Sequence, residues 1–254
     1  MSLANPDWNQ VDTVLVDLDG TLLDLGFDDR FWRHRIPRAF AARHGLGPDE
    51  AWVRLVGLFE AARGTLDWYC LDYWSRTLDL DIAALKRAVR HEVAWLPGAR
   101  EFLAAVRASG RRVVLVTNAH PESLSIKDSH TGVTRQLDRA ISSHEFRAPK
   151  EHAAFWHALA ASEAVAPARM LFLDDSPDVL AAARRFRIGQ VIGIREPVAG
   201  GPPRALDEFA TVAGVRDLID GLCPRSSQDI PIEACEAGER TGLGAQVLAG
   251  GVGG

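Results

Sequence analysis

The chain has 254 residues, of which 47% are hydrophobic and 25% are charged, a composition that allows one globular core and a small second unit. Its formal net charge of -5 creates no global positive field, so we expect neither polymeric nucleic acid nor a membrane as a partner. The first ten residues do not show the pattern of a leader peptide, in which a basic segment is followed by an apolar one. No apolar run approaches the roughly 18 residues of a membrane span.

The first predicted strand lies in the stretch DTVLVDLDGTLLD, residues 12–24. Its apolar run is followed by two carboxylates, Asp17 and Asp19, just before Gly20. Acids next to a buried strand cost free energy unless they have partners, so this stretch calls for a functional reason.

Further along the chain, short runs rich in Val, Ile and Leu alternate with stretches of helical spacing. The runs are residues 112–117 (RVVLVT), 170–174 (MLFLD) and 190–194 (QVIGI). Pro and Gly bound the helical stretches, which begin near Pro97, Pro121 and Pro177. This alternation predicts an α/β fold with a doubly wound parallel sheet, covered by helices on both faces.

Between the first two strands the sequence turns to Trp, Arg, Ala and Leu at helical spacing, over a length too great for a simple crossover. We predict an inserted, all-helical cap over residues 25–96, with Pro37 kinking or restarting its first helix. The catalytic core is then formed by residues 1–24 and 97–222. Residues 223–254, poor in aromatics and rich in glycine, are expected to be a disordered tail.

Polar side chains end three of the four predicted strands. They are Asp17 and Asp19, then Thr117 and Asn118, then Asp174 and Asp175. Ligands of open parallel sheets bind beyond the carboxyl ends of the strands, so these groups should converge. Each acid alone would suit a helix cap or a turn, but three such coincidences are needed to explain them all in that way.

The converging carboxylates favour a bound cation. Two of them about 6 Å apart repel by about 3 kcal/mol at an effective dielectric near 20, so a cluster needs raised pKa values or a metal ion. Mg²⁺, with Mn²⁺ as the alternative, suits oxygen ligands and leaves room for a substrate phosphate.

The motifs VDLDGT, VTN, APK and FLDDS occur in this order, and together they resemble the four motifs of the haloacid dehalogenase-like hydrolase superfamily. The resemblance spans residues 11–222 and implies that fold, a helical cap and phosphoryl transfer through a covalent aspartyl-phosphate. One departure concerns the last motif, where Asp178 falls three residues after Asp175 and Val179 takes the position that is more often polar or Gly.

The resemblance implies roles for the strand-end residues. Asp17 is the expected nucleophile, and Asp19 the acid that protonates the leaving oxygen and then activates water. The expected phosphate-binding residues are Leu18, Thr117, Asn118 and Lys150. The expected metal ligands are Asp17, Asp19, Asp175 and Asp174, with Asp175 preferred to Asp174 as the direct ligand, although the reverse order stays open.

The predicted cap contains GTLDWYCLDYWS, in which Trp and Tyr are concentrated. Asp67, Trp68, Tyr69 and Tyr73 are candidates for recognising a leaving group with a π face, while packing of this helix on the core is the competing interpretation. The amino-acid sequence in and around this stretch resembles that of the bacterial GMP/IMP nucleotidases of the same superfamily. That resemblance implies a purine nucleoside 5'-monophosphate as the substrate.

The three cysteines, Cys70, Cys223 and Cys235, are irregularly spaced and form no CxxC pair, which argues against a disulfide framework or a zinc site. They are expected to be reduced thiols in a cytoplasmic protein. The eight histidines form no HxxxH or HExxH pattern, so surface and packing roles are expected for them. Only His120, just after the VTN motif, is expected near the cleft.

Several other functions use a similar core. A phosphatase for a sugar phosphate or phosphoglycolate, or a phosphomutase, would differ only in the cap. A haloacid dehalogenase is disfavoured by Asp19, because that chemistry needs no acid for an alkoxide leaving group. A phospho-receiver signalling module is disfavoured by the same acid and by the long insertion. The sequence does not predict an oligomeric state.

Overall fold

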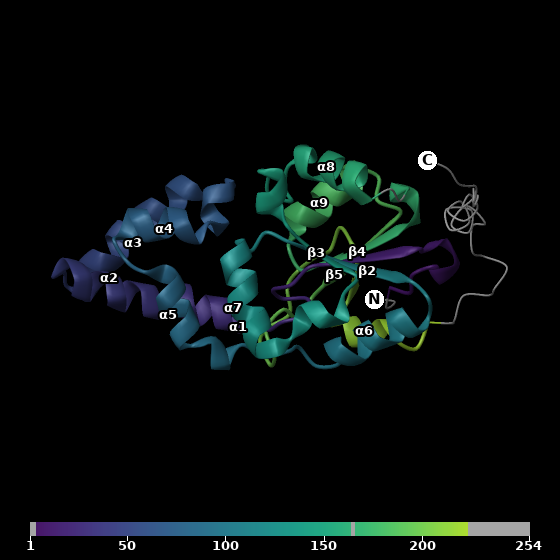
Figure 1. Ribbon diagram of the computed structural model, residues 1–254, viewed down its shortest axis with the longest axis horizontal. Helices are drawn as coiled ribbons and strands as arrows, with labels where there is room; N and C mark the ends of the chain where they lie inside the picture. Colours follow the sequence, from purple (N-terminus) through teal and green to yellow (C-terminus); the bar gives the residue numbers. More distant parts are fainter. Residues whose placement is uncertain (1–3, 164–165, 223–254) are drawn as a thin grey trace, which may run out of the picture. The chain divides into compact units, whose positions relative to one another are not determined.

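The computed structural model describes residues 4–163 and 166–222. Its centre is a six-stranded sheet in the order β3-β2-β1-β4-β5-β6, in which every neighbouring pair is parallel (Figure 1). The strands are β1 (Thr13–Val16), β2 (Arg112–Thr117), β3 (Arg139–Ser142), β4 (Met170–Asp174), β5 (Gln190–Ile194) and β6 (Ala210–Val212). The predicted tail, residues 223–254, lies outside the described residues.

Helices pack on both faces of this sheet. On one face lie α8 (Ala153–Glu163) and α9 (Pro177–Arg185), and on the other lie α6 (Ala99–Ala108) and α7 (Pro121–Thr131) (Figure 1). Alternate strand residues enter the two hydrophobic clusters, as Val14 and Leu15 do, because successive side chains of a strand point to opposite faces. The predicted doubly wound α/β fold is confirmed.

The strand order reverses direction at β1, which pairs with β2 on one side and with β4 on the other. In open α/β sheets this switch point is where ligands bind, because the connections leave a crevice beyond the carboxyl ends of the two strands. Asp17 directly follows β1 at this crevice, and Asp174 is the last residue of β4.

Between β1 and β2 the chain is mainly helical. The helices are α1 (Gly26–Arg30), α2 (Ile36–His44), α3 (Pro48–Ala62), α4 (Leu71–Leu78) and α5 (Ile82–Ala88). A π-helical segment, Phe31–Arg35, joins α1 to α2 just before Pro37. This fits the sequence expectation of a restarted helix, because proline lacks the N–H of a regular α-helical bond.

Two strands were not predicted from the sequence. Both β3 and β6 are edge strands, and β6 has an exposed and a half-buried residue among its three. An edge strand does not need a continuous apolar run, because only a central parallel strand is enclosed on both faces and both sides. The four central strands carry such runs and match the predicted segments.

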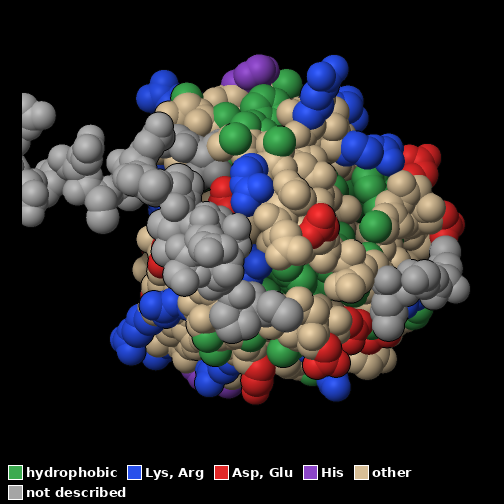
Figure 2. Space-filling model, turned by 90° about the vertical axis from the view of Figure 1, so that its right-hand side faces the viewer, with side chains coloured by type: hydrophobic (Ala, Val, Ile, Leu, Met, Phe, Trp, Pro, Cys, Tyr) green, Lys and Arg blue, Asp and Glu red, His purple; other side chains and the backbone are tan. Residues whose placement is uncertain are grey.

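One face of the molecule is mixed in charge. In Figure 2, Lys and Arg side chains alternate with Asp and Glu over the face shown, without gathering into one patch. Among the described helices, none combines the length and the apolar character that crossing a membrane requires.

Candidate active site

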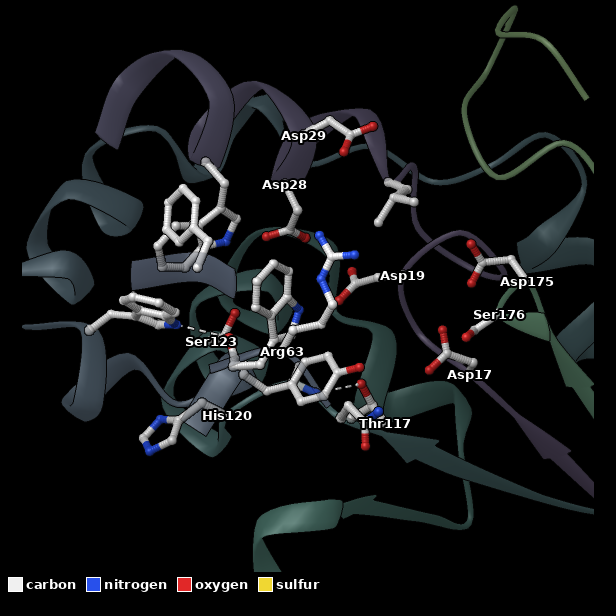
Figure 3. A pocket seen from close by; sticks show the side chains of 18 of the residues that line it. Asp17, Asp19, Asp28, Asp29, Arg63, Thr117, His120, Ser123, Asp175 and Ser176 are labelled. Carbon is white, nitrogen blue, oxygen red and sulfur yellow. Dashed lines mark hydrogen bonds between the residues drawn. The ribbon is translucent and has the colours of Figure 1, made fainter. Parts of the chain in front are cut away.

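A cavity of about 570 Å³ opens beyond the carboxyl ends of β1, β2 and β4. Its walls come from the strand ends on one side and from α1, α3 and α4 on the other (Figure 3). Asp17 and Asp175 lie together at one end of the cavity, while Asp19 and Asp28 lie nearer to the inserted helices.

Asp17 is held at the end of β1 by a buried lysine. The Lys150 ammonium lies 2.5 Å from Asp17 Oδ1 and 2.7 Å from Asp174 Oδ2, and it also donates to the backbone carbonyl of Val116 at 3.0 Å. Burial raises the pKa of Asp17 to about 6, against the opposing effect of Lys150. Burial disfavours the charged form of Lys150 too, but the two carboxylates outweigh it and hold the pKa of Lys150 above its ordinary value.

Asp175 approaches the first motif closely enough to explain Gly20. A Cβ at Gly20 would lie 2.7 Å from Asp175 Cγ and 2.9 Å from Pro197 Cβ, and the φ angle of Gly20 is +87°. Only glycine can adopt this positive φ angle without strain and also leave room for these two neighbours. The oxygen of Asp175 that faces Gly20, Oδ2, also lies 2.9 Å from a nitrogen of Arg204, a residue of the loop between β5 and β6.

Three carboxylates form a possible metal site. Each of Asp17, Asp174 and Asp175 offers an oxygen, and these oxygens all lie within 4.8 Å of one another. Burial, followed by the neighbouring charges of Asp174 and Asp17, raises the pKa of Asp175 well above its ordinary value. A hard divalent cation fits this set, since it would supply the missing positive charge and prefers oxygen ligands.

The Asp19 carboxylate is outside that group and belongs to a second charged network. Lys127 Nζ lies 2.6 Å from both oxygens of Asp19 and 2.5 Å from Asp28, and Lys86 Nζ lies 2.6 Å from the other oxygen of Asp28. Burial, with the nearby charges of Asp28 and Asp17, raises the pKa of Asp19 to about 6 despite Lys127. A carboxyl that titrates near neutral pH can both give and accept a proton.

The predicted phosphate-binding residues lie around the same end of the cavity. Thr117 Oγ1 accepts a hydrogen bond from the Ala119 backbone N–H at 3.0 Å. Asn118 Oδ1 accepts from the Lys150 backbone N–H at 2.9 Å and thereby joins the second motif to the third. The Leu18 side chain is buried in the core, which leaves its backbone as the part that can bind phosphate.

The four cap candidates differ in position. Trp68 and Tyr69 line the cavity, and Tyr69 donates a hydrogen bond of 2.6 Å to Glu151. Asp67 is exposed, and Tyr73 packs edge-on against Trp74 at a centroid distance of 5.0 Å, so neither belongs to the lining. Among the described residues, then, only half of this group faces the cavity. Asp67 differs from its neighbours because the short helix Leu66–Tyr69 turns its side chains in different directions, and Tyr73 belongs to the next helix, α4.

A stripe on α3 supplies a further part of the lining. Its members recur at helical spacing and point to one side: Trp52, Val56, Phe59, Glu60 and Arg63. Trp52 and Val56 are 43% and 37% exposed, which is unusual for large apolar side chains unless they face a ligand or partner. This stripe was not predicted from the sequence.

Three cationic residues of the cavity were not predicted from the sequence either: Lys127, Lys86 and Arg204. For Lys127 and Lys86 the composition of the chain does contain a signal, because the chain has only three lysines but 26 arginines. All three lysines, including Lys150, are buried and line the cavity. Surface cations in this protein are arginines, so a lysine marks the site.

The fold and this arrangement define a hydrolase of the doubly wound α/β class, in which a buried carboxylate, Asp17, contacts Lys150 and lies close to Asp174 and Asp175. Residues 11–187 match the haloacid dehalogenase-like hydrolase family. The chain belongs to this family, as predicted, and is a phosphoric monoester hydrolase.

Two curated relatives carry the name GMP/IMP nucleotidase YrfG, one from Escherichia coli (strain K12) and one from Shigella flexneri. Each is 40% identical over 218 residues, covering 86% of this chain and 98% of the relative. Among solved structures, a HAD phosphatase from Thermococcus onnurineus has a TM-score of 0.70 at 20% identity, covering 84% of this chain and 99% of that one. An L-2-haloacid dehalogenase from Xanthobacter autotrophicus has a TM-score of 0.55 at 22% identity, covering 83% and 97%. At these sequence identities, the two structural similarities support the fold alone.

Proposed function

We propose that this protein is a Mg²⁺-dependent phosphomonoesterase that hydrolyses purine nucleoside 5'-monophosphates, GMP and IMP foremost, to nucleoside and phosphate. Residues 25–96 would act as a cap over a core formed by residues 1–24 and 97–222. The observation that carries the proposal is the contact of Asp17 with Lys150 beside Asp174 and Asp175, at one end of a cavity with aromatic walls. The irregularly spaced cysteines favour a cytoplasmic location.

In the first half of the reaction, a carboxylate oxygen of Asp17 attacks phosphorus and the bond from phosphorus to the 5' oxygen breaks. Asp19 donates its proton to that oxygen, so the nucleoside leaves as a neutral alcohol. Lys150, 2.5 Å from Asp17, offsets negative charge on the transferring group. The Thr117 hydroxyl and the Asn118 backbone N–H would hold phosphoryl oxygens.

In the second half, the ionised Asp19 takes a proton from water. The water oxygen attacks phosphorus of the aspartyl-phosphate, the bond to Asp17 breaks, and inorganic phosphate is released. Lys127 holds both oxygens of Asp19 at 2.6 Å, which fixes the direction in which this carboxyl presents its proton.

The proposed metal ligands are Asp17, Asp175 and the backbone carbonyl of Asp19, with Asp174 in support. When bound, Mg²⁺ neutralises phosphate charge and polarises the phosphoryl oxygens. Asp174 Oδ2 already bonds to Lys150 and its Oδ1 accepts from the Ser176 backbone N–H at 2.8 Å, which favours Asp175 as the direct ligand.

The choice of a purine rests on the aromatic lining of the cavity. Trp52, Phe59, Trp68 and Tyr69 provide π faces, and Arg63 provides hydrogen-bond donors suited to a purine carbonyl. The name of the relatives at 40% identity supports the same choice.

A phosphate-release screen tests both parts of this proposal. GMP, IMP and AMP are compared with sugar phosphates and phosphoglycolate, each with Mg²⁺ and with a chelator. The parent should release phosphate from GMP and IMP fastest, and chelator or Asp17→Asn should reduce the rate by several orders of magnitude. Equal or faster release from sugar phosphates would overturn the purine assignment. Ordinary turnover by Asp17→Asn would overturn the mechanism.

A further inference from the structure

A second group of metal-ligating side chains lies away from the carboxylates. Within residues 4–163 and 166–222, Cys70, His120 and His144 each offer a ligand atom, and these atoms lie within 4.8 Å of one another. Cys70 precedes α4 of the helical insertion, His120 is the N-cap of α7, and His144 lies in the turn after β3. No motif in the sequence indicates this group, because 50 and 24 residues separate successive members.

The hydrogen bonds around His144 leave one ring nitrogen ready to bind a cation. Ser142 Oγ donates its single proton to the Ala119 carbonyl at 2.7 Å, so it can only accept from His144 Nδ1, which lies 3.4 Å from Ser142 Oγ; this favours the tautomer with the ring proton on Nδ1. His144 Nε2 is then a lone-pair acceptor. It is shielded from solvent and has no hydrogen-bond partner among the described residues.

The other two ligands are also available. His120 Nδ1 accepts a long bond of 3.3 Å from the Glu122 backbone N–H, and Nε2 lies 3.8 Å from Asp72 Oδ2, the nearest acid. Binding through His120 Nε2 would move the ring proton to Nδ1 and give up that long bond. Cys70 Sγ has only a 3.4 Å contact with the Tyr73 backbone N–H.

We propose that Cys70, His120 and His144 form a binding site for a borderline transition-metal ion of the Zn²⁺ class, separate from the Mg²⁺ site. One thiolate and two imidazoles are ligands that Zn²⁺ prefers and that Mg²⁺ does not, so the two sites select different ions. Only the thiol releases a proton on binding, because the ring proton of His120 moves from Nε2 to Nδ1 and His144 Nε2 carries none; a fourth position remains for water.

The ligands of this site come from two different parts of the enzyme. Its thiolate comes from the helical insertion and its imidazoles from the sheet side of the cavity, of which His120 is a lining residue. An ion bound here fastens these two parts together at the rim of the cavity. The Asp72 and Asp67 carboxylates nearby add negative charge that favours a cation.

Cobalt binding tests this site without reference to activity. The full chain, stripped of metals with a chelator, is titrated with Co²⁺ in excess Mg²⁺. We expect one equivalent to produce a near-ultraviolet thiolate-to-cobalt charge-transfer band, and Zn²⁺ to remove it. Cys70→Ser should abolish the band and weaken binding by at least roughly tenfold, and His144→Gln should weaken it similarly.

The variants and controls separate this site from other thiols and from loss of fold. Serine is a good N-cap and can keep the bond to the Tyr73 backbone, so Cys70→Ser should fold. His91→Gln, in a side chain that is 70% exposed, and the double variant Cys223→Ser/Cys235→Ser should keep the band. Zn²⁺ should raise the melting temperature of the parent and not of Cys70→Ser. Absence of a band in the parent, or an unchanged band or Zn²⁺ effect in Cys70→Ser, would overturn the site.

Discussion

Replacing Lys127 by Met removes the cation that joins Asp19 to Asp28. Lys127 is 1% exposed, and an ion pair at its 2.6 Å distance from Asp19 has a gross attraction of about 6 kcal/mol at an effective dielectric near 20. The desolvation cost of Lys127 disappears with it, so the net loss is smaller. Removing one partner of a buried ion pair costs about 3–5 kcal/mol, because an uncompensated charge is left behind.

This loss corresponds to a fall in melting temperature of roughly 6–20 °C, at about 2–4 °C per kcal/mol for a protein of this size. Thermal and urea unfolding monitored by circular dichroism measure it. Because Asp19 loses its fixed orientation, we also expect a fall in kcat of about 10²-fold. Arg54→Met, which removes a cation from an exposed pair with Glu50, is the matched control and should change stability by less than about 0.5 kcal/mol. A Lys127→Met protein as stable as this control would refute the reasoning.

Three further outcomes are expected. Gly20→Ala should destabilise the protein and reduce activity more than Gly45→Ala does. Both glycines have a positive φ angle, but only a Cβ at Gly20 would lie 2.7 Å from Asp175. Equal losses in the two variants would mean that backbone strain alone matters. Burial, followed by the charge of His120, lowers the pKa of His144 to about 4, so the unfolded chain takes up a proton near pH 6.5 while the folded one does not. Metal-free protein should therefore lose stability as pH falls from 6.5 to about 4, and His144→Gln should lose less; identical profiles would contradict this. A lysine-acylating reagent should modify the lysines only after unfolding, as mass spectrometry can show, and rapid labelling of folded protein would disprove their burial.

Much of the core could be predicted because central parallel strands leave strong local traces. The middle of β2 (VVLV) and the first four residues of β4 (MLFL) are apolar and buried, since both faces of these strands are covered. Edge strands such as β3 leave a weaker trace, and it was missed. The same logic placed the strand-end acids, because the carboxyl ends of parallel strands share one edge.

The candidate site was predicted in part. Asp17, Asp174, Asp175 and Lys150 do come together, while Asp67 and Tyr73 do not line the cavity. A helical segment repeats its side-chain directions every 3.6 residues, so a short turn before α4 gives no reliable face from its residue types alone.

The sequence by itself determined the four central strands, their alternation with helices and the residues that end each of them, because periodicity and chain polarity are local properties. Only the tertiary structure decided which charges pair. Lys127 reaches Asp19 across 108 residues, and Cys70 meets His144 although they belong to different elements. Such pairs depend on how elements pack in space, and packing leaves no fixed spacing along the chain.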